Sequence, residues 1–142
     1  MTRIAKCQCG GFRVITSGEP EAINICHCQA CQRRSGVPLT ANAYFHKSAV
    51  HLEGEYRIYV RDAKEGRQFQ NHFCPTCGST VCWTPDIRPH HYGVAVGAFN
   101  DPAFPPPTAS LYEQSKYTWV ELPPDIQHFP QDRPIPPLAP SS

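Results

Sequence analysis

Cys7-Gln8-Cys9-Gly10-Gly11 and Cys74-Pro75-Thr76-Cys77-Gly78 are two short stretches in which paired cysteines stand beside glycines. Glycine permits the tight turn that aims neighbouring thiols at one point, so each stretch is typical of half a metal-binding knuckle. Two such halves supply four thiolates, the ligand number of a closed tetrahedral zinc site. The sequence therefore predicts a structural zinc that ties the first hairpin to a strand near mid-chain, with the ligands Cys7, Cys9, Cys74 and Cys77.

A third group of cysteines lies between these stretches, in Cys26-His27-Cys28-Gln29-Ala30-Cys31. It offers three thiolates and has no fourth cysteine close in sequence. Zinc with three protein ligands keeps one coordination position open, which is the usual arrangement of a catalytic zinc. We therefore expect a second, labile or catalytic zinc at Cys26, Cys28 and Cys31, where a thiol substrate would bind as its thiolate.

Other residues could close this second site and make it structural. His27 points away from its cysteine neighbours in an extended backbone, so we expect its ring to lie on the surface or to support the cluster by a hydrogen bond. Cys82 stands apart on a later strand and is expected to be a small buried hydrophobe. Asp86, His90 and His91 lie in a loop that could reach the site, but we assign them no role.

Short strand-forming runs follow one another along the chain, separated by glycine, proline and charged turns. Residues 29–34 alone permit a short helical turn, which should stop at Gly36 and place Cys28 and Cys31 on one face. This pattern predicts an all-β fold, an open sandwich or open barrel of antiparallel strands. The expected strands are Arg3–Lys6, Phe12–Thr16, Asn24–Cys26, Leu39–Phe45, Val50–Leu52, Tyr56–Val60, Gln68–Phe73, Thr80–Trp83 and Tyr92–Ala98.

The chain has 142 residues, 40% of them hydrophobic, which is the size and composition of one globular domain. From Asp101 onward it holds 11 of its 16 prolines, which limits regular structure there to short edge segments. We expect the aromatic run Tyr117–Leu122 to lie across the open face of the sheet. The sequence predicts one zinc-binding β domain over residues 1–130 and a proline-rich tail over residues 131–142.

Charge and hydropathy argue against two classes of partner. The formal net charge is +1, so no excess of positive charge is present to neutralise nucleic-acid phosphates. No stretch approaches the roughly 20 apolar residues of a membrane span. The start, Met1–Cys7, has no apolar signal-peptide region, which predicts a cytoplasmic location where thiols stay reduced and bind metal rather than form disulfides. The oligomeric state is left open.

Three motifs occur in a fixed order: C-x-C-G at residues 7–10, C-H-C-x-x-C at residues 26–31 and F-C-x-x-C-G-S at residues 73–79. Together with Arg33 and Ser35-Gly36 they resemble the glutathione-dependent formaldehyde-activating enzyme family, which includes centromere protein V. The resemblance covers residues 3–129 and implies a zinc-stabilised β-tent fold. It also implies the same division of the seven cysteines into structural and labile or catalytic zinc ligands, and the addition of glutathione to formaldehyde, formally a carbon–sulfur lyase reaction run in the synthetic direction.

We interpret the chain as a zinc-dependent enzyme that adds glutathione, or a related thiol, to an aldehyde such as formaldehyde. Glutathione would be the co-substrate, and Arg33 or Arg34 would bind one of its carboxylates. Three thiolates leave a zinc ion with a net charge of about −1, which weakens it as a Lewis acid. A module that binds glutathione or another thiol without turnover therefore stays an alternative, and a zinc-stabilised interaction protein is a third hypothesis.

Overall fold

The computed structural model describes residues 1–132, and residues 133–142 of the expected tail lie outside the described part. Strands dominate residues 1–132 and the single α-helix among them is short, so the all-β prediction is confirmed. No helix within residues 1–132 has the length and apolar character needed to cross a lipid bilayer.

The strands are β1 (Thr2–Lys6), β2 (Phe12–Ser17), β3 (Ala22–Cys26), β4 (Thr40–His46), β5 (Val50–Gly54), β6 (Arg57–Asp62), β7 (Gln68–Phe73), β8 (Thr80–Thr84), β9 (His91–Ala95), β10 (Ala109–Leu111) and β11 (Gln127–His128). The helix is α1 (Gln29–Ser35), and the 3₁₀ turns are η1 (Lys47–Ala49), η2 (Lys64–Gly66), η3 (Val96–Phe99) and η4 (Glu113–Ser115).

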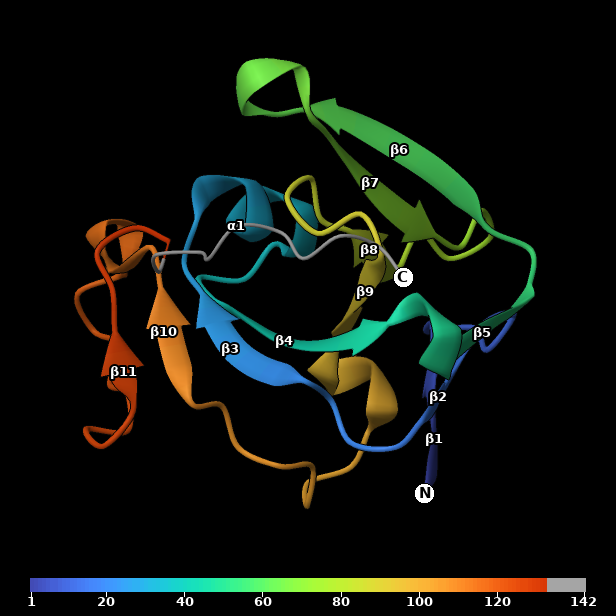
Figure 1. The fold of residues 1–142 in the computed structure, drawn as a ribbon, viewed down its shortest axis with the longest axis horizontal. Coiled ribbons are helices and arrows are strands. Elements are labelled where there is room, and N and C mark those ends of the chain that lie inside the picture. The colour runs from blue at the N-terminus through green and yellow to red at the C-terminus, as the bar shows by residue number, and fades with distance from the viewer. Residues whose placement is uncertain (133–142) are drawn as a thin grey trace.

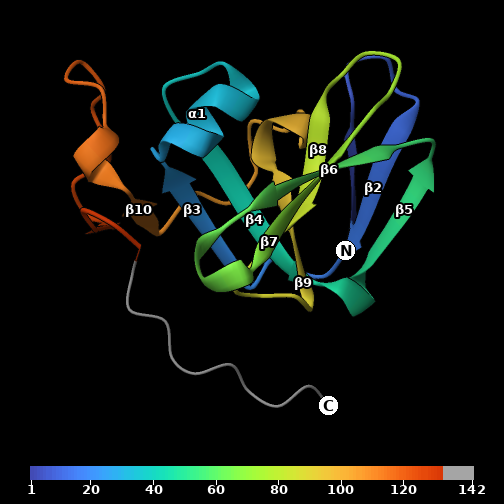
Figure 2. The same cartoon turned by 90° about the horizontal axis from the view of Figure 1, so that it is seen from above.

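Two sheets share the strands unequally (Figure 1). β1, β2 and β5 form a three-stranded antiparallel sheet, and the other strands form one eight-stranded sheet in the order β11-β10-β3-β4-β9-β8-β7-β6. In Figure 2 the smaller sheet stands at one side of the larger one. The apolar core lies between them, where Phe12 and Val14 of β2 pack with Phe45 of β4 and Val94 of β9.

The alternation of side chains along β2 explains which face of the smaller sheet is buried. Along β2 the side chains of Phe12, Val14 and Thr16 are fully buried, whereas Arg13 and Ile15 between them are half-buried. Successive side chains of a strand point to opposite faces, so the apolar set of β2 is directed into the core.

Three features differ from the expectations drawn from the sequence. The strand expected over Tyr92–Ala98 ends at Ala95, because the next residues turn into η3. Strands β10 and β11 are not expected from the sequence, and both pair in parallel, β10 with β3 and β11 with β10. The aromatic run Tyr117–Leu122 does not cover the sheet, since Trp119 is 69% exposed and Val120 is the buried residue of the run.

Helix α1 follows β3 closely and positions the second cysteine group. Cys28 caps the helix, and its Sγ accepts a hydrogen bond from the Cys31 N–H at 3.3 Å. Gly36 ends the helix with φ 75°, in the left-handed region that favours glycine, as the sequence predicts. In Figure 1, α1 and the tip of the β6–β7 hairpin both lie above β3 and β4.

Candidate metal centres

Four cysteines from two distant turns meet at one point. Cys7, Cys9, Cys74 and Cys77 bring their Sγ atoms within 4.8 Å of one another. The Sγ of Cys9 lies 3.6 Å from that of Cys7 and 3.6 Å from that of Cys74. Sulfurs bound tetrahedrally at the usual Zn–S distance of about 2.3 Å are separated by about 3.8 Å, so this donor set fits zinc. The structure thus brings together the two cysteine pairs that the sequence predicts to share one metal site.

Backbone groups of these turns are directed at the sulfurs. The N–H of Phe12 donates to Cys7 Sγ at 3.2 Å, and the N–H of Thr76 donates to Cys74 Sγ at 3.4 Å. Hydrogen bonds of this kind favour the ionised form of a thiol. The two turns are therefore shaped to hold thiolates, which are the metal-binding form of cysteine.

The four thiols nevertheless differ in how readily they ionise, because each affects the pKa of its neighbours. Hydrogen bonds with Ser79 lower the pKa of Cys77 to about 5. The larger effect comes from the Ser79 hydroxyl, which lies 3.4 Å from Cys77 Sγ, and the smaller from the Ser79 N–H. The N–H of Gly11 favours the Cys9 thiolate, but hydrogen bonds with Cys74 and Cys7 outweigh it and raise the pKa of Cys9 to about 11. All four thiols can ionise together only when a cation compensates their mutual repulsion.

The second group, Cys26, Cys28 and Cys31, also brings its Sγ atoms within 4.8 Å of one another. The pKa of Cys28 is lowered to about 2, mainly by its hydrogen bond with Cys26 and to a smaller extent by its hydrogen bond with Cys31. The hydrogen bond between Cys26 and Cys28 has the opposite effect on Cys26 and raises its pKa. Within residues 1–132 no fourth cysteine, histidine or carboxylate joins the group. Its donor set fits a metal ion with one position left for another ligand.

The three-cysteine group opens into a cavity of about 990 Å³. One face of the large sheet forms the floor, with Cys26 of β3 and Tyr44 of β4 among its side chains. The tip of the β6–β7 hairpin contributes a wall that includes Arg61 and Lys64. Cys74 of the first group lies instead in the apolar core, where it is 2% exposed.

The floor contains polar residues that no sequence motif marks as functional. Asn24 of β3 and Asn42 of β4 stand opposite each other, and the Asn42 amide Nδ2 donates to Asn24 Oδ1 at 3.3 Å. Both are almost fully buried and line the cavity, as do Tyr44 and Trp83. The signal that could have found them is an asparagine inside an apolar strand run, such as Ile23-Asn24-Ile25, because buried polar side chains usually have a specific partner.

Comparison with known proteins identifies the family. The sequence profile described as "Glutathione-dependent formaldehyde-activating enzyme" matches residues 2–115, which include all seven cysteines of the two groups. The chain belongs to this family. The chemistry of the formaldehyde-activating family is the glutathione-dependent activation of formaldehyde, a lyase-type reaction.

The fold has a counterpart among solved structures. A crystal structure of a Rhodobacter sphaeroides protein, a Northeast Structural Genomics target, matches with a TM-score of 0.55 and 21% sequence identity. The match covers 75% of this chain and 92% of that chain, and shows a shared fold. A search of curated proteins finds no match.

In this member of the formaldehyde-activating family, neither His27 nor Cys82 joins the open cysteine group. His27 is fully buried, so a surface position is excluded, and its Nε2 lies 2.9 Å from the hydroxyl oxygen of Ser110 in β10. This contact anchors the turn that carries Cys26 and Cys28 to the neighbouring strand. Cys82 lies in the apolar core, where burial raises its pKa to about 12, and the expectation of a small buried hydrophobe is confirmed.

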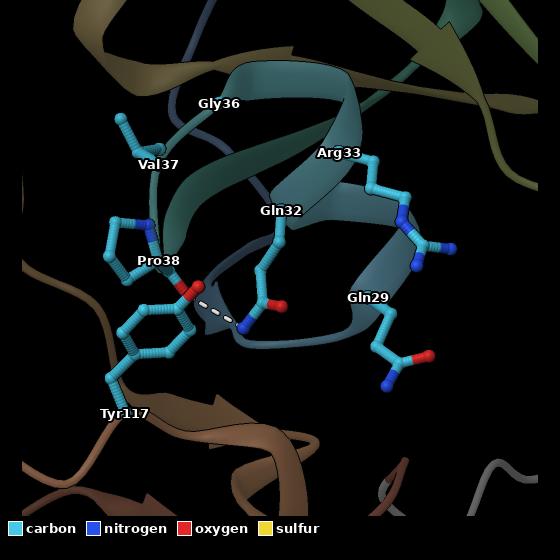
Figure 3. Close-up of a pocket in the computed structure, with 7 residues that line it drawn as sticks. All are labelled: Gln29, Gln32, Arg33, Gly36, Val37, Pro38 and Tyr117. Carbon is cyan, nitrogen blue, oxygen red and sulfur yellow. Dashed lines mark hydrogen bonds between the residues drawn. The ribbon is translucent and has the colours of Figure 1, made fainter.

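Arg33 and Arg34 lie in different surroundings. The guanidinium carbon of Arg34 is 4.0 Å from the ring centroid of Trp83, on the cavity floor, and its charge favours the thiolate of Cys28. Arg33 lines a separate pocket of about 490 Å³, and Figure 3 shows it on the far side of Gln32 from Tyr117. The remaining residues of that pocket are Gln29, Gly36, Val37 and Pro38.

Two of the three loop residues left without a role line the cavity. Asp86 accepts a hydrogen bond from Arg67 Nε at 3.1 Å, and His91 Nε2 lies 2.6 Å from Glu21 Oε2. His90 is exposed and is not among the residues that line the cavity. Because Asp86 and His91 are already paired, they shape the rim of the cavity.

Proposed function

We propose that the protein binds zinc at both cysteine groups and catalyses the addition of a small thiol, glutathione in the first place, to an aldehyde such as formaldehyde. The observation that carries the proposal is that the three-cysteine group faces a cavity of about 990 Å³ and has no fourth ligand within residues 1–132. The structural zinc would be held by Cys7, Cys9, Cys74 and Cys77, and the catalytic zinc by Cys26, Cys28 and Cys31.

The size of the cavity supports a thiol larger than a single amino acid. Cavities that bind small molecules commonly enclose about 300–1,000 Å³, and this one lies at the upper end of that range. A site for formaldehyde alone would need far less space. The remaining volume is consistent with a tripeptide thiol lying along the cavity with its sulfur at the cysteine group.

A zinc ion held by three thiolates would offer its fourth position to the substrate sulfur and favour the ionised sulfur. Arg34 would bind a carboxylate of the thiol substrate, because stacking on Trp83 fixes its guanidinium beside the cysteine group. Arg61 and Lys64 face the same cavity without an acidic partner in residues 1–132, so they are available for a second carboxylate. Neither Arg33 nor Arg34 lines the cavity itself, but Arg34 stacks on Trp83, which does. Arg33 lines the other pocket and receives no role.

The reaction needs no reagent beyond the two substrates. The thiol loses its proton, a sulfur–carbon bond forms at the carbonyl carbon, and the carbonyl π pair moves to oxygen, which takes up a proton. The product is a hemithioacetal, S-hydroxymethylglutathione when formaldehyde is the aldehyde. Free thiolate ligands require a reducing compartment, which supports a cytoplasmic location.

The test is the visible spectrum of the cobalt-substituted protein during titration with reduced glutathione, with oxidised glutathione as the control that lacks a thiol. Bands that report cobalt–thiolate bonding should shift with the reduced tripeptide alone. An unchanged spectrum would show that the three cysteines already have a permanent fourth partner, and the proposal would be abandoned.

A rate measurement separates an enzyme from a binding module. Wild-type protein should accelerate formation of the glutathione–formaldehyde adduct above the spontaneous rate, and removal of zinc should abolish the acceleration. A shift of the cobalt spectrum without acceleration would instead support a thiol-binding module that has no turnover.

A further inference from the structure

A row of three residues crosses the cavity floor perpendicular to the strands. Trp83 of β8 pairs with Gly93 of β9, and Gly93 pairs with Tyr44 of β4. Paired residues share a sheet face, so the indole and the phenol lie on the same side with only a glycine between them. A Cβ atom on Gly93 would lie 2.1 Å from Trp83 Nε1, which shows that the indole passes directly over this glycine towards Tyr44.

The hydroxyl of Tyr44 has a donor nearby but no acceptor among residues 1–132. Although burial has the larger effect, the indole of Trp83 is near enough to the phenol to lower the pKa of Tyr44, and an indole nitrogen can only donate. No residue within 1–132 accepts a hydrogen bond from the Tyr44 O–H, although Tyr44 lines the cavity. Burial raises the pKa of Tyr44, so the phenol keeps its proton over the physiological range.

Asn42 presents the complementary group two residues along the same strand face. Its Nδ2 is engaged by Asn24, but its Oδ1 has no hydrogen-bond partner. The side chain is 2% exposed and lines the cavity. A buried acceptor without a partner is costly, which points to a ligand that supplies a donor here.

The two groups lie near the cysteine cluster. Asn24, opposite Asn42, is two residues before Cys26 on the same face of β3, a separation of about 6.6 Å along a strand. Tyr44 is close enough to Cys26 and Cys31 for their charges to disfavour its ionisation. An atom bonded to a sulfur held at the cluster would therefore lie close to this part of the floor.

We propose that the Tyr44 hydroxyl and the Asn42 carbonyl form a subsite for the oxygen atom of the aldehyde, with Trp83 as the residue that positions Tyr44. The inference rests on the proposed function and adds the residues that recognise the second substrate. An aldehyde oxygen accepts hydrogen bonds and cannot donate, so it uses Tyr44 alone. Once the sulfur–carbon bond has formed and this oxygen carries a proton, the new hydroxyl also donates to Asn42. The pair therefore binds the hydroxyl adduct more tightly than the aldehyde. The Tyr44 O–H also donates to the negative charge that develops on this oxygen as the sulfur–carbon bond forms, and this is the differential binding that accelerates the reaction.

The test compares two ligands that differ in one hydroxyl group, S-hydroxymethylglutathione and S-methylglutathione, by calorimetry with zinc-loaded protein. Wild type should prefer the hydroxyl ligand about 30-fold, because its hydroxyl makes two hydrogen bonds that the methyl ligand lacks, one with Tyr44 and one with Asn42. Tyr44→Phe removes the first of these, so it should reduce the preference to about fivefold. It should also lower kcat/KM for adduct formation about 100-fold, as loss of one oxygen-binding donor does elsewhere. Tyr92→Phe is the matched control, because Tyr92 is adjacent to Gly93, faces the other side of β9 and packs against His72.

The outcomes separate this inference from the function on which it rests. A reduced preference in Tyr44→Phe, with zinc content and binding of reduced glutathione unchanged, supports the subsite even if no turnover is found. An undiminished preference in Tyr44→Phe, or no preference in wild type, overturns the subsite even if the enzyme turns over. Should Tyr44→Phe fail to fold, Asn42→Ser is read in the same way, and an undiminished preference in that variant also overturns the inference.

Discussion

The four-cysteine group should contribute far more to stability than the three-cysteine group, and Cys74→Ser tests this. The group joins the β1–β2 turn to the β7–β8 turn, and its members Cys9 and Cys74 are 65 positions apart with sulfurs 3.6 Å from each other. On the chain-entropy relation, a crosslink over a loop of this length stabilises the fold by about 4 kcal/mol. The net stability of a domain is only about 5–15 kcal/mol, so breaking this link should leave the protein close to unfolding or aggregation.

The matched variant is Cys28→Ser, which removes one ligand from the other group. That group spans only five positions, from Cys26 to Cys31, and the same relation gives about 2 kcal/mol for so short a loop. Serine also retains the ability to cap helix α1 where Cys28 does so now. We expect Cys28→Ser to lose thiol binding while its fold stays intact.

The assay is urea unfolding of wild type and both variants, with zinc per chain measured by mass spectrometry. Each variant should lose one zinc ion, and Cys74→Ser should lose at least about 2 kcal/mol more free energy of unfolding than Cys28→Ser. Equal losses would show that both zinc ions are structural. A Cys74→Ser protein as stable as wild type after losing its zinc would refute the argument that this site fastens the two sheets together.

Three further predictions concern residues around the sites. Arg34→Met should raise KM for glutathione about tenfold, whereas Arg33→Met should leave KM nearly unchanged because Arg33 lines the other pocket. Steady-state kinetics of both variants tests this, and equal effects would contradict the assignment of Arg34 to glutathione. Gly93→Ala should lower the free energy of unfolding by about 1–3 kcal/mol and change the tryptophan fluorescence, because the new Cβ would collide with the Trp83 indole. A variant with wild-type stability and fluorescence would contradict the close approach of this indole to Gly93. Burial raises the pKa of Cys82 from 9.0 to about 12, which favours the neutral thiol in the folded state. The resulting stability is complete below pH 9 and falls as pH rises towards 12, by up to about 1.4 kcal/mol per pH unit. Urea unfolding at pH 8 and pH 10 should therefore show a smaller loss in Cys82→Ala than in wild type, and equal losses would contradict the neutral buried thiol.

The two cysteine groups were predictable because their geometry is local. Cys7 with Cys9, and Cys74 with Cys77, are held by tight turns whose glycines are visible in the sequence, and the number of thiolates pairs one turn with the other. The helix stop at Gly36 is readable for the same reason, since only the left-handed conformation of one residue is needed.

The cavity floor was not predictable, because it depends on which strands pair and in what register. Asn24 and Asn42 are 18 positions apart and meet only when β3 pairs with β4. Trp83 reaches Tyr44 only because β9 places a glycine between them. The parallel strand β10 is equally invisible, since its partner β3 lies far earlier in the chain and its three residues are too few to show a pattern.

The two cysteine groups occupy different positions in the fold, and these positions suit one group to stabilising the fold and the other to exchanging a ligand. The four-cysteine group draws its thiols from two hairpin turns, so loss of the zinc proposed there would loosen the contact between the sheets. The three-cysteine group draws all its ligands from one turn between β3 and α1, and His27 fixes that turn to Ser110 of β10 without using a ligand. A zinc ion bound at this group, as proposed, would therefore exchange its fourth ligand or leave while both sheets remain paired. The proposed enzyme must accept and release a sulfur at each turnover and would need this independence, which the division of the cysteines between two turns and one would provide.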